Sequence, residues 1–509
     1  MNNETMPQAE DQKDNNGLSV HLENIQQEIG KLRPNANPLM SHKFGADPYA
    51  LVFNNRVYLY MTSDKLEYDT NEVPQKNSYQ SINKITVISS DDLINWTDHG
   101  EIKVAGPEGA ATWASQAWAP AAAHRNFDGA DRFYLYFANN ASGIGVLSAP
   151  TPIGPWTDPI GKALVTRETP GVEDVTWLFD PAVLVDDDDQ AYLYFGGGVP
   201  EGKPERPDTA RVMRLGEDMV SVEGKAKVIP APFMFENSGI HKYDNIYYYT
   251  YCSNFFQVER DENSPPPGEI AYMTSAQPMG PWTYQGTILK NPGSFFGIGG
   301  NNHHAIFPLE NQWYIAYHAQ TLCQAMDIPE GYRSTHLNRV EYEETSGRIK
   351  AIHADYAGVE QLKSFNPYQR INGSTMGWNA GVNTRQLRSS GSEQVEQGES
   401  SEQNEVVSLM HGGSWIAISR VDFGEKGAAS FTASLCSQGA GCTLELRLGR
   451  EDGDLIGKVH IPALAEGQEW IEATTSVTGA RLEHDLYLVL KPSAQNSCIL
   501  LSHWMFEEA

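Results

Sequence analysis

The 509-residue chain is short of positive charge and of long apolar runs. It carries 37 Lys and Arg against 65 Asp and Glu, a formal net charge of −28. This balance argues against nucleic acid or an anionic membrane surface as the main partner, because both require a basic footprint. No apolar run reaches the length of a membrane-spanning helix, and the polar segment 1–17 lacks the apolar stretch of a secretory signal. We therefore expect a cytoplasmic protein.

Cysteine is also scarce. The five cysteines, at positions 252, 323, 436, 442 and 498, are odd in number and lack the spacing of a metal site. We interpret them as mostly reduced, buried thiols, as the cytoplasm favours. A disulfide between Cys436 and Cys442 is the alternative. Hydrophobic residues make up 40% and aromatic residues 10% of the chain, which is ordinary for a folded protein large enough for two or three domains.

A short aromatic strand recurs five times between residues 37 and 364. The second residues of these strands are Tyr58, Tyr134, Tyr192, Tyr247 and Tyr314. The intervals between these five tyrosines fit the length of a four-stranded blade with loops of variable length. A turn followed by Trp-Thr recurs at Trp96, Trp156 and Trp282, and we interpret these tryptophans as packed between blades. The pattern predicts a five-bladed β-propeller over residues 37–364, after a leader at 1–36 that is flexible or helical to about residue 30.

Residues 365–509 have a different character. The stretch 388–403 is rich in Ser, Glu, Gln and Gly, which predicts a mobile loop. Segments that alternate in polarity follow it, at 415–419, 443–448 and 486–490. Such segments are typical of half-buried strands in an antiparallel sandwich. The predicted fold is therefore all-β, a five-bladed β-propeller followed by a β-sandwich of the jelly-roll kind.

Four polar residues, Asp47, Asp180, Glu236 and His303, lie eleven or twelve positions before the tyrosines of four aromatic strands. The innermost strands of all blades line one channel, so residues at equivalent positions should converge there. For Asp47 alone, an aspartate that closes a turn is the alternative, but the Asp-Pro pair recurs at 180–181. Large apolar neighbours make Glu236 a candidate for a raised pKa, with a surface glutamate as the alternative.

Two or three carboxylates around a channel suggest glycoside hydrolysis. One carboxylic acid protonates the leaving oxygen, and an ionised carboxylate activates a water on the opposite face of the sugar. A third carboxylate can tune the pKa of the acid. His303 could bind a central ion directly or through water, or be a core histidine. Arg333 could contact sugar hydroxyls or hold a carboxylate, and the acidic run 186–189 favours a hairpin turn over a metal cluster.

Residues 37–364 resemble glycoside hydrolase family 43, five-bladed propeller enzymes that act on xylan and arabinan side chains and oligomers. The matching motifs occur in the same order, one per blade, at 46–49, 118–120, 179–182, 235–238 and 302–304. Residues 365–509 resemble a family 6 carbohydrate-binding sandwich, with motifs at 366–371, 413–416 and 421–424. Where that sandwich family carries acidic calcium ligands, this chain has 372–374 (Asn-Gly-Ser) and 501–503 (Leu-Ser-His). This departure puts both the calcium of the sandwich and its binding of polysaccharide in doubt.

The resemblance implies roles for the candidate residues. Asp47 becomes the general base, Asp180 the pKa modulator and orienter, and Glu236 the general acid of an inverting reaction. Arg333, together with the aromatic residues Trp118 and Phe179 of the matching motifs, becomes a substrate contact. His303 then belongs to a central ion or water site in the channel, where calcium is the candidate ion. No cofactor is required for the chemistry.

The first expectation is an inverting exo-acting β-xylosidase that removes terminal β-1,4-D-xylosyl residues from xylo-oligosaccharides, with α-L-arabinofuranosidase side activity. The alternative is an α-L-arabinofuranosidase that debranches arabinoxylan. A non-enzymatic sugar-binding propeller is a further alternative, against which three intact carboxylates argue. Xylo- or arabinoxylo-oligosaccharides are thus the expected partners, and neither nucleic acid nor membrane is expected.

Overall fold

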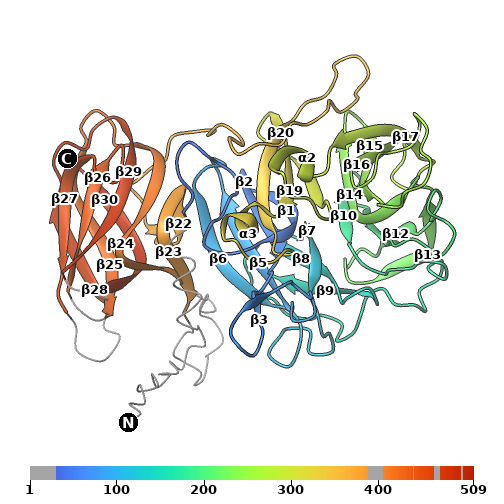
Figure 1. The fold of residues 1–509 in the computed structure, drawn as a ribbon, viewed down its shortest axis with the longest axis horizontal. Helices are drawn as coiled ribbons and strands as arrows, with labels where there is room; N and C mark the ends of the chain where they lie inside the picture. The colour runs from blue at the N-terminus through green and yellow to red at the C-terminus, as the bar shows by residue number, and fades with distance from the viewer. Residues whose placement is uncertain (1–29, 388–404, 439–440, 464–469, 494–496) are drawn as a thin grey trace, which may run out of the picture.

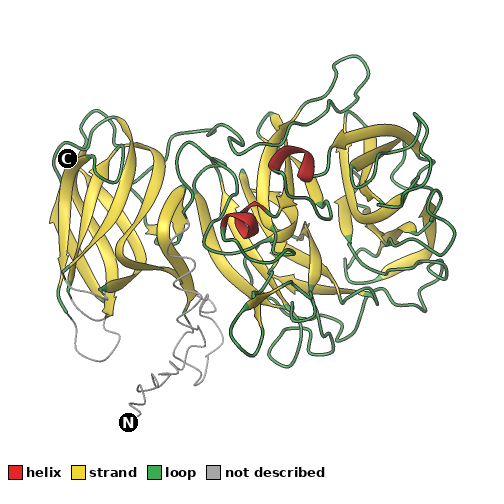
Figure 2. Cartoon of the chain, viewed as in Figure 1, coloured by secondary structure: helices red, strands yellow, loops and turns green. Residues whose placement is uncertain are grey.

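The computed structural model describes residues 30–387, 405–438, 441–463, 470–493 and 497–509. Within them the chain forms small antiparallel sheets arranged like a propeller and a larger sheet that curls into a sandwich (Figure 1). Strands dominate, and the helices α2 (Gly293–Phe296) and α3 (Thr321–Ala325) are each about one turn long (Figure 2). The predicted all-β class, with a five-bladed propeller and a sandwich, is confirmed.

Five sheets of the described chain correspond to the predicted blades, and each begins with its innermost strand. The first three are β1 (Ala46–Phe53), β2 (Arg56–Thr62), β5 (Lys84–Ser90) and β6 (Trp96–Lys103); β7 (Trp118–Phe127), β8 (Ala130–Ala138) and β9 (Ile144–Ala149); and β10 (Ala182–Val185), β11 (Ala191–Phe195), β12 (Ala210–Leu215) and β13 (Val222–Ile229). The last two are β14 (Met234–Tyr243), β15 (Ile246–Ser253), β16 (Ile270–Ser275) and β17 (Thr283–Leu289); and β18 (His304–Leu309), β19 (Gln312–Ala319) and β20 (Ser334–Val340). A small ribbon of β3 (Glu67–Tyr68) and β4 (Pro74–Gln75) lies between β2 and β5 in the chain. The aromatic repeats form the second strand of each blade.

The repeated tyrosines join neighbouring blades. The Tyr60 hydroxyl donates to the Pro152 carbonyl at 2.6 Å, and the Tyr194 hydroxyl donates to the Pro278 carbonyl at 2.6 Å. Both prolines lie in the turn that precedes a Trp-Thr pair one blade further on. Buried hydroxyls need such partners, because an unpaired polar group in a core is costly. This requirement explains why the aromatic strands and the turns recur together.

The Trp-Thr tryptophans pack between blades, as predicted. The Trp156 ring contacts the Tyr60 ring edge-on at 6.2 Å, and Trp282 lies 6.4 Å from Tyr194 in the same geometry. Trp96 is buried among residues of the first and fifth sheets. Each tryptophan therefore fills the space between two sheets, where offset or edge-on aromatic packing is favourable.

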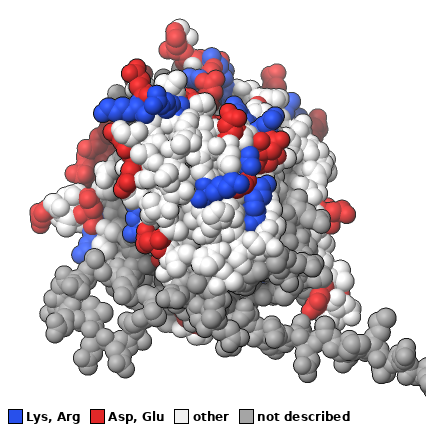
Figure 3. All heavy atoms as spheres, turned by 90° about the vertical axis from the view of Figure 1, so that its left-hand side faces the viewer, with Lys and Arg blue, Asp and Glu red and all other residues white. Residues whose placement is uncertain are grey.

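The sandwich is a sheet of nine strands within the described residues. Its central path runs β27 (Asp454–Ile461), β26 (Cys442–Leu448), β29 (Glu483–Pro492), β24 (Val406–Asp422), β30 (Cys498–Glu508), β25 (Ala428–Gln438) and β28 (Ile471–Ser476). Two further strands, β21 (Ile371–Asn372) and β23 (Trp378–Gln386), pair with β30 and β24. Apolar residues of both faces meet in one buried cluster, and acidic and basic side chains are interspersed on the outer face that Figure 3 shows.

The sandwich and the first blade share hydrogen bonds. Strand β22 (Thr375–Met376), from the segment predicted to belong to the sandwich, pairs with β6 as an extra strand of the first sheet. The Asn95 side chain donates to the Ser419 carbonyl at 3.1 Å and accepts from the Ser419 N–H at 2.8 Å. Figure 1 shows the two parts side by side at this junction. A strand from the segment 365–509 thus completes the first sheet of the propeller.

Several smaller expectations meet the structure here. Residues 186–189 form the turn between β10 and β11, as predicted. Cys252, Cys323, Cys436 and Cys442 are buried thiols outside any disulfide, so the alternative pair Cys436–Cys442 does not form. Most of the predicted leader (1–29) and the predicted mobile loop (388–403) lie outside the described residues. Among the helices that are described, none has the length and hydropathy needed to cross a membrane.

Candidate active site

The innermost strands of several blades share one backbone irregularity. The pairing of β1, β7 and β14 with their neighbours shifts at Asp47, Ala119 and Glu236. Asp47 and Asp180 have φ angles of 48° and 49°, and Asn237 has 64°. Asp and Asn tolerate this left-handed conformation better than most residues, and a bulge turns side chains away from the regular alternation. The bulges therefore aim Asp47 and Glu236 into the channel rather than between sheets.

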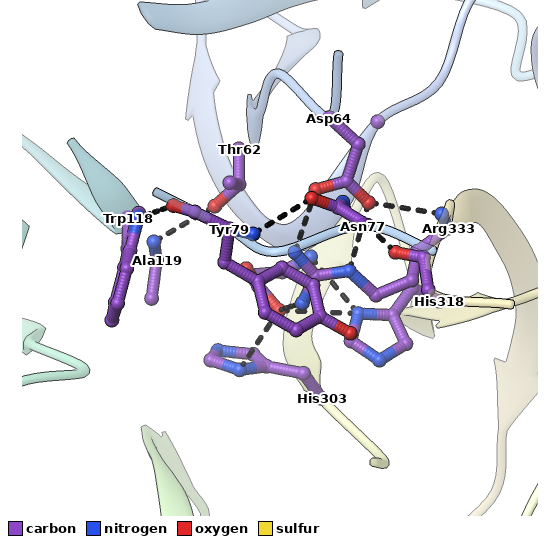
Figure 4. Close-up of polar contacts among 12 residues, drawn as sticks. Thr62, Asp64, Asn77, Tyr79, Trp118, Ala119, His303, His318 and Arg333 are labelled. Carbon is purple, nitrogen blue, oxygen red and sulfur yellow. Dashed lines mark hydrogen bonds and ion pairs between the residues drawn. The ribbon is translucent and has the colours of Figure 1, made fainter. Parts of the chain in front are cut away.

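Arg333 connects Asp47 to a second buried carboxylate, Asp64. Its guanidinium donates to Asp47 Oδ1 at 2.8 Å and, through Nε and a terminal nitrogen, to both oxygens of Asp64 at 2.9 and 2.8 Å. The Arg333 N–H also donates to Asp64 at 2.9 Å. Figure 4 shows the Arg333 side chain beside Asp64. A two-pronged pair of this kind fixes both the position and the charge of the guanidinium.

Two histidines flank Asp47. The Asp47 N–H donates to His318 Nδ1 at 3.0 Å, so we assign the His318 proton to Nε2, which faces the Asn301 carbonyl at 3.2 Å. His303 Nδ1 lies 3.4 Å from Asp47 and 3.8 Å from Asp180. Burial lowers the pKa of His303 to about 3, so its imidazole is neutral at physiological pH. Neutral imidazoles at these distances leave Arg333 as the main cation of the site.

The charge state of Asp47 follows from this surrounding. Burial alone would raise its pKa, but the Arg333 charge holds the pKa of Asp47 well below its usual range. The carboxylate is 5% exposed and hydrogen-bonded. Asp47 is therefore ionised over the whole physiological range.

Glu236 and Asp180 have the opposite tendency. Burial, followed by the negative charge of Asp47, raises the pKa of Glu236 to about 7. Burial and the charges of Glu236 and Asp47 also raise the pKa of Asp180. Because neighbouring buried carboxylates resist double ionisation, the pair retains one proton near neutral pH. The Asn237 N–H donates to Asp180 at 2.9 Å, whereas Glu236 Oε1 is buried with no hydrogen-bond partner among the described residues, so we assign the proton to Glu236.

Trp118 is connected to the site by its contact with Tyr79. The half-buried Trp118 indole donates to the Tyr79 carbonyl at 3.0 Å, and the Ala119 N–H donates to the Thr62 hydroxyl at 2.8 Å. The Arg333 guanidinium lies 5.1 Å from the Tyr79 ring centre. Figure 4 shows the Tyr79 ring facing the Arg333 side chain. Tyr79 thus covers the Arg333 side of the site, and Trp118 forms the next part of its wall.

On the other side, Phe179 belongs to a group of aromatic rings. Trp177 contacts Phe179 edge-on at 5.2 Å and Phe235 at 5.4 Å. A Cβ at Gly197 would lie 2.7 Å from the Phe179 ring and 3.3 Å from the Glu236 Cα, so only glycine allows this approach. We call Trp177, Phe179 and Phe235 the aromatic platform, and it lies directly beside Glu236.

Comparison with known proteins places this geometry in a family. The model described as "Glycosyl hydrolases family 43" matches residues 36–346. The chain belongs to glycosyl hydrolase family 43. A second model, "Carbohydrate binding module (family 6)", matches residues 385–508. Both resemblances noted from the sequence are confirmed, and the protein is a glycoside hydrolase.

Individual relatives of this family 43 enzyme are similar over nearly its whole length. It is 48% identical to an arabinoxylan arabinofuranohydrolase of Paenibacillus polymyxa, over 94% of this chain and 75% of that protein. It is also 48% identical to an arabinoxylan arabinofuranohydrolase of Bacillus subtilis, over 94% of each chain. A crystal structure of the arabinoxylan arabinofuranohydrolase from Bacillus subtilis, in complex with cellotetraose, superimposes with a TM-score of 0.90 at 46% identity, over 95% of this chain and 100% of that one.

The donor groups in the channel of this family 43 enzyme do not resemble a calcium site. No group of three or more His, Cys, Asp or Glu side chains in the described part of the chain is arranged to hold a metal. Calcium takes six to eight oxygen ligands, whereas His303 offers a nitrogen and Asp47 is already held by Arg333. The channel calcium remains a prediction, and no step of the chemistry is assigned to it.

The structure brings all the sequence candidates to one region. Asp47, Asp180, Glu236, His303 and Arg333 meet at the channel, while Trp118 and Phe179 form its walls. Sequence reasoning missed three further residues, Asp64, Tyr79 and His318. Asp64 and His318 lie at or just beyond the ends of aromatic strands. Polar residues at the end of each aromatic strand are therefore a sequence pattern that could have indicated them.

Proposed function

We propose that this enzyme is an inverting α-L-arabinofuranosidase that removes arabinofuranosyl side chains from arabinoxylan. The observation that carries the mechanism is the charge difference between two buried carboxyl groups of one site. Asp47 is held ionised by Arg333, while Glu236, whose pKa is raised to about 7, keeps a proton. An ionised base and a protonated acid facing one channel are what inverting glycoside hydrolysis requires.

In the proposed reaction Glu236 donates its proton to the glycosidic oxygen as the bond from that oxygen to the anomeric carbon breaks. A water on the opposite face attacks the anomeric carbon, and its proton passes to Asp47. The products are free arabinose of inverted configuration and a xylan chain that carries a free hydroxyl where the arabinosyl group was attached. Asp180 lies beside Glu236, and because two buried neighbouring carboxylates resist double ionisation, the pair retains one proton. Arg333 holds Asp47 in place with Asp64 as its anchor.

The choice of arabinoxylan rests on two supports. The relatives at 48% identity are named arabinoxylan arabinofuranohydrolases, which favours the alternative expectation over the β-xylosidase that was expected first. The aromatic platform beside Glu236 also offers ring surfaces on which sugar rings of a polymer can pack. A polymeric substrate weakens the reason for expecting a cytoplasmic enzyme, which remains a prediction.

The test compares the sugars released from wheat arabinoxylan and from xylo-oligosaccharides by the wild type, Glu236→Gln and Glu223→Gln. Glu223 is exposed on β13 and serves as the matched control. We expect the wild type and Glu223→Gln to release arabinose from arabinoxylan, and Glu236→Gln to release very little. Xylose as the main product would restore the β-xylosidase expectation. Equal activity of all three proteins would remove Glu236 from the mechanism.

A further inference from the structure

A long loop extends the aromatic platform outward. Residues 254–268 connect β15 to β16, and Phe255 and Phe256 on this loop are 41% and 50% exposed. The Phe255 ring meets the Phe235 ring edge-on, with centres 5.5 Å apart. A Cβ at Gly268 would come within 2.3 Å of the Phe255 ring, so the end of the loop leaves space for that ring. Exposed phenylalanines that continue a platform beside a catalytic acid require an explanation.

Arg260 forms hydrogen bonds to several backbone carbonyls of this loop. The Arg260 guanidinium donates to the carbonyls of Asn254 at 2.7 Å and Phe256 at 3.3 Å, and to that of Pro265. It also lies 4.1 Å from the ring centre of Phe233, in the wall beneath the loop. A planar guanidinium can reach several carbonyls and stack on a ring at once, which a lysine ammonium cannot do.

The base of the loop is fixed to the propeller by Asn254. Asn254 is fully buried; its backbone N–H donates to the Phe233 carbonyl and its side-chain amide donates to the Pro204 carbonyl, both at 2.7 Å. Arg260 also donates to the Asn254 side-chain oxygen at 3.0 Å. Arg260 therefore links the exposed part of the loop to an anchor in the core.

We propose that Arg260 is a positioning residue that holds loop 254–268 so that Phe255 and Phe256 form an outer subsite for the xylan backbone. The proposal rests on the proposed function, because it assigns part of the same polymer to this surface. A loop of this length would otherwise sample many conformations, and ordering it on binding would cost affinity. With Arg260 in place, the rings are already arranged when the polymer arrives. The arginine acts through the phenylalanines and takes no part in bond cleavage.

The experiment separates polymer binding from chemistry. We would measure kcat and KM on arabinoxylan, and kcat/KM on 4-nitrophenyl α-L-arabinofuranoside, which has no xylan backbone. The variants are Arg260→Ala, Arg260→Lys and Phe255→Ala, with Arg348→Ala as control because Arg348 is an exposed arginine outside the loop. Retardation in gels that contain unsubstituted xylan provides a readout of backbone binding that needs no activity.

We expect Arg260→Ala and Phe255→Ala to raise KM on arabinoxylan by about 3- to 10-fold, the effect of losing one aromatic contact, with little change in kcat. Activity on the aryl substrate should stay unchanged, and Arg260→Lys should recover only part of the loss. Because the two residues act through one contact, the double variant should lose little more than either single variant.

Two results would overturn the proposal. One is an unchanged KM and unchanged gel retardation in Arg260→Ala. The other is an equal loss on both substrates, which would mean that Arg260 only stabilises the fold. Failure of the proposed function is distinguishable, because the wild type would then release no arabinose while the gel retardation still reports whether Arg260 supports binding to xylan.

Discussion

Replacing Glu236 with Gln removes the acidic proton of the proposed acid with little change in side-chain shape. Glu236 Oε1 has no hydrogen-bond partner among the described residues, so an amide group breaks no hydrogen bond at that atom. Loss of general acid catalysis should reduce kcat about 10²- to 10⁴-fold on arabinoxylan, where a sugar alkoxide must leave. The loss should be much smaller on 4-nitrophenyl α-L-arabinofuranoside, because nitrophenolate leaves readily without a proton.

The same substitution changes the pH dependence of activity. Glu236 must be protonated to act, and its pKa is about 7, so wild-type kcat/KM on arabinoxylan should fall about tenfold per pH unit above that value. In Glu236→Gln this alkaline decline should disappear. The acid side should extend well below neutral pH, because Arg333 keeps Asp47 ionised there.

At alkaline pH, the Glu236→Gln substitution should raise the stability of the protein although it lowers the activity. The pKa of Glu236 rises from 4.5 in a model peptide to about 7 in the folded protein, so the folded state binds more protons than the unfolded state. The contribution of Glu236 to stability is thus lost as the pH rises from about 4.5 to 7, and totals up to about 3 kcal/mol. At pH 8 the Gln variant should therefore unfold at a higher temperature than the wild type. Equal losses on both substrates, or an alkaline decline that persists in the variant, would refute the assignment.

Three further substitutions or deletions test other parts of the account. Arg333→Met should destabilise the protein by about 3–5 kcal/mol in thermal unfolding, because Asp47 and Asp64 become buried charges without a partner, and it should move the acid decline of activity toward neutral pH. Gly197→Ala should cost about 1–3 kcal/mol and lower kcat, because its Cβ would lie 2.5 Å from the Phe235 carbonyl oxygen. Deletion of residues 365–509 should lower the melting temperature of the propeller, because the first sheet loses β22; an unchanged melting curve would show that the sandwich is only tethered.

The fold was predictable because its signal repeats. Each aromatic strand packs in the same place in its blade, and Tyr60 and Tyr194 make equivalent bonds to the next blade. A repeat imposed by packing appears in the sequence at every blade. The convergence of Asp47, Asp180 and Glu236 followed from the same regularity, because equivalent positions of a propeller share one axis.

The rest depended on contacts that leave no local pattern. Asp64 and Arg333 are 269 residues apart, and no sequence motif around either residue indicates that the two form an ion pair. Trp415 lies in a segment that was assigned to the sandwich by resemblance, yet it belongs to the apolar cluster at the junction with the propeller, beside Ile94. The pairing of β22 with the first sheet was hidden for the same reason. Substrate preference could not be predicted from the motif either, because the same acid and base pair of carboxylates can serve the hydrolysis of either pentoside.

The measurement that tests the central claim most directly is the configuration of the first product. Hydrolysis of 4-nitrophenyl α-L-arabinofuranoside would be followed by proton NMR from the first turnovers, before mutarotation mixes the anomers. If Asp47 activates water on the face opposite the leaving group, β-L-arabinofuranose appears first. The α-anomer as first product would show a covalent intermediate, and Asp47 would then be a nucleophile rather than a base.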